Sequence, residues 1–156
     1  MILARNASGP VLRLEPEEAQ LLSLLLDELT ALLRDDAETN DDVLRRLNPA
    51  AYRDDPDAEA EYRALTEGSL RDVRDDRITA CRAELANGGD VELGDPEAAR
   101  RWLQVLNDLR LALGTRLGVT QDAEPDIDPN DPAAQPWIVY SWLTAVQDAV
   151  VHGISL

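Results

Sequence analysis

Several residue types are scarce or absent in this chain, and their scarcity excludes several kinds of site. The sequence has no lysine, no phenylalanine, one cysteine and one histidine in 156 residues. A single cysteine excludes an internal disulfide. Cys81 and His152 lie far apart in sequence, so they supply no zinc-type ligand set and argue against a Cys-His catalytic pair. His152 falls near the end of a predicted helix, which accounts for its presence. We therefore expect no bound metal and no cofactor.

Long apolar runs and targeting signals are missing as well. No stretch approaches the roughly 20 apolar residues that a membrane-spanning helix needs. The N-terminus has no cationic segment followed by an apolar run, as a secretory signal would. A chain of this length folds most simply as one domain. We expect a single α-helical domain, residues 1–156, that is cytoplasmic and has no membrane partner.

The sequence also lacks the motifs of common enzyme classes. It has no glycine-rich phosphate loop, no nucleophile elbow and no paired glutamate-histidine motif. Residues 126–131 begin like a calcium loop, but Asp131 occupies the position that requires glycine, and Trp137 replaces the closing glutamate. We expect a protein that is not an enzyme and has no calcium site of this type.

Basic residues are few relative to acidic ones. Fifteen arginines oppose 31 acidic residues, which gives a net charge of −16. Phosphate contacts supply most of the affinity in nonspecific nucleic-acid binding, and a field of this sign repels phosphate. DNA is therefore a disfavoured partner, whereas a basic protein surface would be attracted. The alternative is that the acidic surface serves solubility alone.

Helix boundaries are marked by Asp-Pro pairs and glycines. Aspartate caps free amide groups and proline is tolerated at the first helical position, whereas glycine adopts the left-handed conformation that ends a helix. These signals predict four long helices at 17–35, 56–86, 95–117 and 133–152, with a short one at 41–47. Segments 11–14 and 90–93 are predicted to pair as a two-stranded ribbon, and 119–132 to be an exposed loop rich in Asp and Pro. The fold class is mainly α, a compact bundle or array.

Two arginines interrupt the leucine stripe of the third long helix. Arg110 and Arg116 fall on its apolar side, where a guanidinium needs a carboxylate partner. Glu28 on the first helix and Asp76 on the second are the candidate partners. The cluster is either an internal ion-pair network that fixes helix register or a pocket for an anion or other ligand. Its predicted members are Arg110, Arg116, Glu28, Asp76, Asn107, Tyr140 and Gln147.

The second long helix carries charges of both signs, which is typical of a solvated face. Cys81 falls on its apolar side with Ile78 and Leu85, as a buried and unreactive thiol would. The alternative is a redox-active Cys81 whose pKa is lowered by nearby arginines. Exposed tryptophans would indicate a self-association surface, so a homodimer stays open.

Three runs of sequence resemble an actinobacterial family. They are LNDLRLALGTRLGV (106–119), RRLNPAAYRDDPDAEAEYRALTEGSLR (45–71) and VYSWLTAVQDAVV (139–151). The family is a domain of unknown function whose genes often lie near that of the ClpS proteolytic adaptor, and some members are described as transcriptional or oxidative-stress regulators. The resemblance implies no catalytic residues, and a switch that needs two cysteines in one chain is excluded here. It marks the following motif positions: Arg45, Tyr52, Asn107, Asp108, Arg110, Arg116, Tyr140 and Trp142.

Together these observations predict a cytoplasmic regulatory protein that acts by binding another protein, with a basic surface on that partner. Two alternatives belong to other classes. One is a helical bundle that senses a small anion through Arg110 and Arg116. The other is a transcriptional regulator that binds DNA directly.

Overall fold

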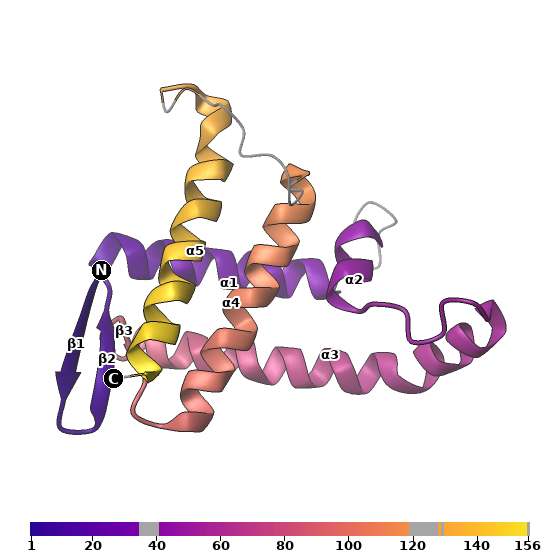
Figure 1. The fold of residues 1–156 in the computed structure, drawn as a ribbon, viewed down its shortest axis with the longest axis horizontal. Helices are drawn as coiled ribbons and strands as arrows, with labels where there is room; N and C mark the ends of the chain where they lie inside the picture. Colours follow the sequence, from indigo (N-terminus) through magenta and orange to yellow (C-terminus); the bar gives the residue numbers. More distant parts are fainter. Residues whose placement is uncertain (35–40, 119–127, 129, 156) are drawn as a thin grey trace.

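The structure, a computed structural model, describes residues 1–34, 41–118, 128 and 130–155 (Figure 1). It is predominantly α-helical with a small antiparallel sheet, which confirms the predicted fold class. Of the predicted exposed acidic loop at 119–132, residues 119–127 and 129 lie outside the described residues. The helices are α1 (Pro16–Arg34), α2 (Asp41–Leu47), α3 (Pro56–Ala86), α4 (Pro96–Leu117) and α5 (Gln135–Ile154), and the strands are β1 (Ile2–Asn6), β2 (Gly9–Arg13) and β3 (Asp90–Glu92).

Helices α3 and α4 begin at the Asp-Pro pairs that mark them in the sequence, whereas α5, predicted at 133–152, begins at Gln135 and continues through Gly153 to Ile154. The Asp55 side chain accepts a hydrogen bond from the Ala58 amide at the start of α3. The Asp95 side chain likewise accepts a hydrogen bond from the Glu97 amide at the start of α4. Gly118 ends α4 in the left-handed conformation, with a φ of 70°. These caps satisfy backbone groups that have no partner inside the helix. A short 3-10 helix, Pro132–Ala134, precedes α5.

The predicted ribbon is confirmed, and the sheet contains a third strand. β2 pairs antiparallel with β3 so that Leu12 lies opposite Val91. β1 adds to the other edge of β2, giving the order β1-β2-β3. Both Leu12 and Val91 are fully buried, because one face of the sheet packs against the helices. A two-stranded ribbon would be marginal by itself, and this packing stabilises it.

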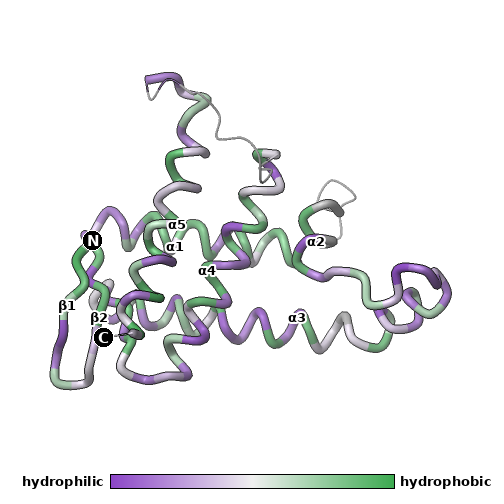
Figure 2. Tube along the Cα trace, viewed as in Figure 1, coloured by the Kyte–Doolittle hydropathy of each residue, from purple (hydrophilic) through white to green (hydrophobic). Residues whose placement is uncertain are grey.

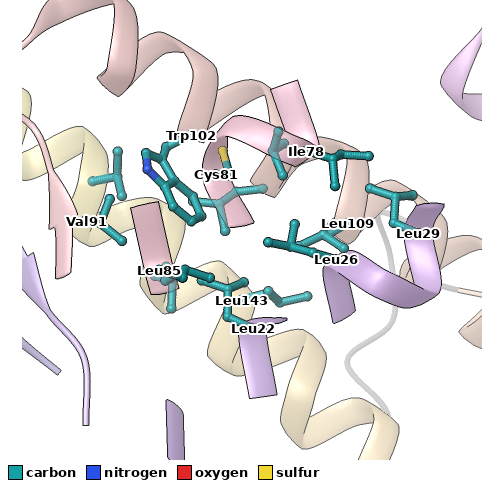
Figure 3. Close-up of a cluster of buried hydrophobic side chains, with 14 of the residues drawn as sticks. Leu22, Leu26, Leu29, Ile78, Cys81, Leu85, Val91, Trp102, Leu109 and Leu143 are labelled. Carbon is teal, nitrogen blue, oxygen red and sulfur yellow. The ribbon is translucent and has the colours of Figure 1, made fainter. Parts of the chain in front are cut away.

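The helices form two crossing layers. Figure 1 shows α1 and α3 lying lengthwise along the molecule with opposite chain directions, with α4 and α5 crossing them, and both chain ends on the side of the sheet. The hydropathy colouring places apolar segments of α1, α4 and α5 where these layers cross (Figure 2). The core at the crossing combines Leu22 and Leu26 of α1, Ile78 of α3, Trp102 of α4 and Leu143 of α5 (Figure 3).

The tryptophans do not form an exposed surface. Trp102 is fully buried, and Trp137 and Trp142 are half-buried. The indole N–H of Trp142 donates a hydrogen bond to Glu18 Oε1 at 3.3 Å, which ties α5 to the first turn of α1. The tryptophans therefore do not provide a surface for self-association. None of the described helices is long and apolar enough to cross a membrane.

Candidate functional site

Arg110 is held by neutral groups of α5. Its Nε donates a hydrogen bond to Thr144 Oγ1 at 3.2 Å, and its Nη1 donates to Gln147 Oε1. The guanidinium also lies over the Tyr140 ring, 5.6 Å from the centroid, in a cation-π arrangement. The predicted association of Arg110 with Tyr140 and Gln147 is therefore present. Dipoles and a ring face surround the half-buried charge, and no carboxylate among the described residues forms an ion pair with it.

The other predicted members of the cluster are not buried, and this part of the prediction is wrong. Arg116, Glu28, Asp76 and Asn107 are all exposed, and the described residues contain no ion pair of Arg110 or Arg116 with Glu28 or Asp76. Glu28 and Arg116 do line one small pocket of about 40 Å³. Helix periodicity predicts burial along the whole leucine stripe of α4, but the neighbouring helices leave Arg116 exposed. Water reaches Arg116, so its charge needs no partner.

A different ion pair is buried in the structure. Arg74 Nε of α3 lies 3.5 Å from Asp108 Oδ2 of α4, and these two side chains are 14% and 12% exposed. The remaining donors of Arg74 reach the end of α2, where Nη1 donates to Asn48 Oδ1 and Nη2 donates to the Leu47 carbonyl at 2.6 Å. One guanidinium therefore joins α2, α3 and α4.

The environment of Asp108 opposes its charge. Burial raises the pKa of Asp108 above its ordinary value, and the positive charges of Arg74 and Arg77 partly offset that increase. Asp108 is one of the motif positions marked by the family resemblance, yet helix periodicity did not place it in the core. The short helix α2 packs against α4 and extends the buried arc of that helix.

The arginines and the exposed acidic residues of α3 lie on different sides of the helix. The predicted solvated face with charges of both signs is therefore wrong. Its arginines are half-buried and contact the bundle, as Arg82 does at 2.7 Å from Asp27 of α1. Glu84 likewise pairs with Arg101 of α4 at 3.5 Å. The exposed charges are acidic. They include Asp57, Glu61, Asp72 and Asp76.

Large apolar side chains are exposed among those acidic residues. Leu65 is 76% exposed and Val73 is 45% exposed. At 100° per residue they share one side of α3 with the exposed acids. We call this surface the α3 outer face, defined by Glu61, Leu65, Asp72, Val73 and Asp76. Exposed apolar residues rimmed by polar ones mark interaction surfaces more often than isolated exposed leucines do.

A pocket of about 370 Å³ lies between α2 and α3, and we call it the α2–α3 pocket. Its apolar walls come from the ends of α1 and α2 and from α3, and its polar groups come mainly from α3. Most of its lining residues belong to the run 45–71 that resembles the family, and this run is the available sequence signal for the pocket. The lining residues are Leu33, Leu44, Leu47, Asn48, Pro49, Glu59, Tyr62, Arg63, Thr66, Leu70, Arg71 and Arg74.

The segment between α2 and α3 is tied down beside this pocket. Glu59 Oε2 accepts a hydrogen bond from the Tyr52 amide at 2.8 Å, and Glu59 Oε1 accepts one from Arg63 Nε at 2.8 Å. The hydrogen bond from Tyr52, together with Arg63, holds the pKa of Glu59 below its ordinary value. The Tyr52 and Tyr62 rings pack edge to face with centroids 5.9 Å apart.

Cys81 lies in the core at the crossing (Figure 3). Its side chain is fully buried, and burial raises its pKa to about 12, with Arg101 and Glu84 acting in opposite directions. These features fit the unreactive thiol better than the redox-active one. His152 is exposed near the end of α5. Among the described residues, no group of histidine, cysteine, aspartate or glutamate could hold a metal ion.

The described chain is thus mainly helical, with an apolar core at the crossing, ion pairs between neighbouring helices, and an exposed acidic and apolar helix face beside a pocket. It belongs to the family described as Domain of unknown function (DUF2017), whose model matches residues 2–154. No solved structure matches the chain.

Curated relatives of the chain carry regulator names. The proteins named "Oxidative stress regulator AosR" in Mycobacterium tuberculosis and Mycobacterium bovis are 32% identical over 167 residues, which span 96% of this chain and 75% of the relative. A relative in Mycobacterium leprae whose name also includes oxidative stress regulator AosR is 27% identical over 94% of this chain and 83% of its own length. These names suggest a regulatory role for the family.

Proposed function

We propose that this chain is a non-enzymatic, cytoplasmic regulatory protein that binds a protein partner through the α3 outer face, and that the partner surface is basic and partly apolar. The observation that carries the proposal is the exposed pair Leu65 and Val73, set among Glu61, Asp72 and Asp76. The N-terminal half of α3 extends beyond the crossing with α4 and α5 (Figure 1). A partner can therefore approach this face without obstruction from the bundle.

Burial and charge act together on such a face. Covering an exposed leucine or valine contributes about 1.5 to 3 kcal/mol when the side chain becomes fully buried. The acidic rim adds complementarity to a basic surface and raises the rate of encounter, because opposite potentials steer association. The net charge of −16 acts over the whole molecule in the same direction.

Direct DNA binding receives less support from the same geometry. A helix that binds DNA presents arginines to phosphates and base edges. On α3 the arginines are half-buried and several of them pair with carboxylates of the bundle, whereas the exposed charges are acidic. The regulator names of the relatives are compatible with either mechanism, and the charge distribution favours a protein partner.

Site-specific photo-crosslinking in cells tests the proposal. A photoreactive amino acid replaces Leu65 in one variant and Leu24 in another, because Leu24 is 54% exposed on α1 and gives a matched control. We expect a specific crosslinked protein from position 65 and none of it from position 24. The purified crosslinked protein should bind the unmodified chain, and its binding should be lost with Leu65→Asp or Asp72→Arg. Identical crosslinks from both positions, or binding that survives both substitutions, would overturn the proposal.

A further inference from the structure

We propose that the partner segment that binds the α3 outer face is a basic amphipathic helix, and that this helix inserts one large apolar side chain into the α2–α3 pocket. This inference rests on the proposed function and names the structural class of the partner segment. It joins two features of the same half of α3, the outer face and the pocket. Figure 1 shows α2 and the chain that follows it alongside that half, with α4 and α5 crossing farther along.

The exposed apolar side chains of α3 form a band that connects the outer face with the pocket. Leu65 and Val73 belong to the outer face, whereas Tyr62 and Leu70, 39% and 41% exposed, line the pocket. At about 100° per residue the four positions fall within an arc of about 140°. We call these four residues the α3 apolar band. It extends about 17 Å along the helix, which is about three turns.

A helix is the element that matches this band. Side chains three and four residues apart on a partner helix follow one side with the same rise as those of α3, so the two sets can interdigitate. A partner strand would instead need a sheet edge for its backbone hydrogen bonds. The band lies inside a helix of 31 residues, where backbone N–H and C=O groups are paired within the helix.

The charges beside the band favour a basic helix over a second copy of this chain. The exposed charged residues of the outer face are Glu61, Asp72 and Asp76, and all three are acidic. A helix with arginine or lysine flanking its apolar side would place opposite charges next to them. A second copy would bring the same carboxylates against each other, and like charges repel at short distance.

The α2–α3 pocket provides a socket for one side chain of that helix. Its volume of about 370 Å³ admits a large aromatic or aliphatic side chain. Its apolar walls include leucines from the ends of α1 and α2, namely Leu33, Leu44 and Leu47. Apolar anchors that fill such pockets contribute a large share of the binding energy in protein interfaces.

The charged residues of the pocket lining are already paired. Arg63 lies 2.8 Å from Glu59, and Arg74 lies 3.5 Å from Asp108. Arg71 is not without a partner either. The lining therefore suits an uncharged side chain better than an anion, and the leucine walls favour an apolar one.

The pocket walls are fixed before a partner binds. Arg74 Nη2 donates a hydrogen bond to the Leu47 carbonyl at 2.6 Å, and Nη1 donates to Asn48 Oδ1. Glu59 Oε2 accepts one from the Tyr52 amide at 2.8 Å. A preformed socket loses less conformational entropy on binding than a site that must order itself.

Two synthetic peptides of about 18 residues, long enough for about five helical turns, test the proposal on the full chain. One has a tryptophan and several leucines on one side of the helix and lysines elsewhere. The other has the same composition in scrambled order, so it keeps the charge and loses the apolar side. Backbone amide chemical shifts are followed in about 150 mM NaCl, where the screening length is about 8 Å.

We expect saturable shifts from the amphipathic peptide within residues 44–49 and 62–73, and affinity of the scrambled peptide lower by about tenfold. Equal affinity of the two peptides would show recognition by charge alone. Shifts centred on α1 or α5 would place the site elsewhere. Either result would overturn the proposal.

Leu70→Asp and Leu24→Asp are a matched pair that tests the band. Leu24 is 54% exposed on α1 and does not line the pocket. Both substitutions add a negative charge, which by itself favours binding of a lysine-rich peptide. Leu70→Asp should nevertheless weaken binding by about tenfold, because it removes an apolar contact, and Leu24→Asp should not weaken it. Equal effects of the two substitutions would contradict the assignment of the α3 apolar band.

Thr66→Trp tests the pocket. Thr66 lines the pocket and its hydroxyl donates to the Tyr62 carbonyl of the same helix, so a tryptophan fills the pocket from α3. We expect binding to weaken by about tenfold, whereas Thr79→Trp, at an exposed position of α3 outside the pocket, should bind as the unmodified chain does. Thermal unfolding verifies that each variant is folded. Replacing the tryptophan of the peptide with alanine should give the same loss in the unmodified chain, and unaltered binding in that case would overturn the role of the pocket.

The cellular partner separates this inference from the proposed function. Mass spectrometry of the protein crosslinked at position 65 identifies the segment that contacts the band. A basic amphipathic helix is the expected segment. A specific partner that contacts position 65 through a strand or a loop would overturn this inference and leave the proposed function in place. The absence of a specific partner would overturn the proposed function itself.

Discussion

At the scale of single residues, Arg74 and Arg110 show how differently two half-buried guanidinium groups can be satisfied. Arg110 contacts neutral oxygens and a tyrosine ring, whereas Arg74 contacts the buried carboxylate of Asp108. If Arg110 is replaced by an uncharged residue, only neutral polar groups lose their partner. If Arg74 is replaced, the buried carboxylate of Asp108 keeps a negative charge with no positive charge beside it, and this lowers stability much more.

The first prediction compares the two arginines. Arg74→Met should lower the free energy of unfolding by about 3 kcal/mol at neutral pH, because Asp108 loses its nearest positive charge. Arg110→Met should lower it by about 1 kcal/mol, since Thr144 and Gln147 are half-buried and water can replace their donor. Urea unfolding of both variants measures the difference. Equal losses, or a larger loss for Arg110→Met, would contradict the assignment of the buried ion pair.

The second prediction concerns the pH dependence contributed by Asp108. Its pKa is raised in the folded state, so from about pH 4 up to that raised pKa the folded chain keeps a proton that the unfolded chain has released. The stability of the unmodified chain therefore falls as pH rises through this window, and Asp108→Asn lacks that loss. We expect the unfolding free energy of Asp108→Asn, relative to the unmodified chain, to increase from about pH 4 to about pH 7. If this difference in unfolding free energy decreased over that pH range, the positive charge of Arg74 would lower the pKa of Asp108 more than burial raises it.

The third prediction is that Cys81 is unreactive in the folded protein. A rise of the thiol pKa from 9.0 to about 12 lowers the thiolate fraction at neutral pH by about a thousandfold, and full burial adds a barrier to access. Alkylation by iodoacetamide should therefore be slower by orders of magnitude in the folded chain than in urea. Mass spectrometry over time gives both rates. A folded-state rate within about tenfold of the unfolded rate would restore Cys81 as a candidate redox sensor.

At the scale of elements, the sequence predicted the long helices because their signals are local. An Asp-Pro pair or a glycine specifies a boundary through the backbone of its own few residues, and α3 has the predicted bounds of 56–86. β1 was missed because Ile2–Asn6 has no clear alternation of apolar and polar residues. The turn residues Asn6, Ser8 and Gly9 were the available signal, since Asn6 Oδ1 accepts a hydrogen bond from the Ser8 amide.

The candidate sites were less predictable because they depend on which elements meet. Periodicity identifies the apolar side of α4, but the cover over Asp108 comes from α2, whose packing no local pattern determines. Periodicity likewise places Arg116 on the apolar side of α4, but this residue lies in the last turn of the helix and is exposed. The prediction that Arg110 meets Tyr140 and Gln147 succeeded because α4 and α5 pack along their apolar stripes, a contact that periodicity does anticipate.

The fourth prediction uses two glycines in different elements. A Cβ at Gly94, after β3, would lie 1.9 Å from the Ser8 carbonyl oxygen, whereas a Cβ at Gly68, within α3, would meet nothing within 4 Å. Gly94→Ala should therefore lower the unfolding free energy by about 2 kcal/mol through displacement of the β1–β2 turn. Gly68→Ala should raise it by about 0.5 to 1 kcal/mol, because alanine loses less conformational entropy in a helix. Urea unfolding checks both. Destabilisation by Gly68→Ala would indicate that α3 is not a regular helix at this position.

At the scale of the whole molecule, the arrangement of charge has two consequences that oppose each other. Partly buried ion pairs such as Arg74 with Asp108 and Arg101 with Glu84, both at 3.5 Å, join neighbouring helices and stabilise the fold. The chain has a net charge of −16, and the exposed acidic residues of the described part, such as those of the α3 outer face, repel one another. Salt screens exposed charges far more effectively than partly buried ones.

The fifth prediction follows from that difference in screening. Between about 10 mM and about 150 mM NaCl the screening length falls from about 30 Å to about 8 Å. This removes repulsion between distant surface carboxylates and affects partly buried contacts at 3.5 Å much less. We therefore expect the melting temperature to rise with NaCl over this range. Asp72→Asn and Asp76→Asn, both on the α3 outer face, should raise the melting temperature in low salt and have a smaller effect in high salt. A melting temperature that falls as NaCl is added would mean that interhelical ion pairs dominate. In that case the acidic residues of the α3 outer face would not lower the stability of the fold. A rising melting temperature would indicate that they do lower it, as residues of a binding surface often do.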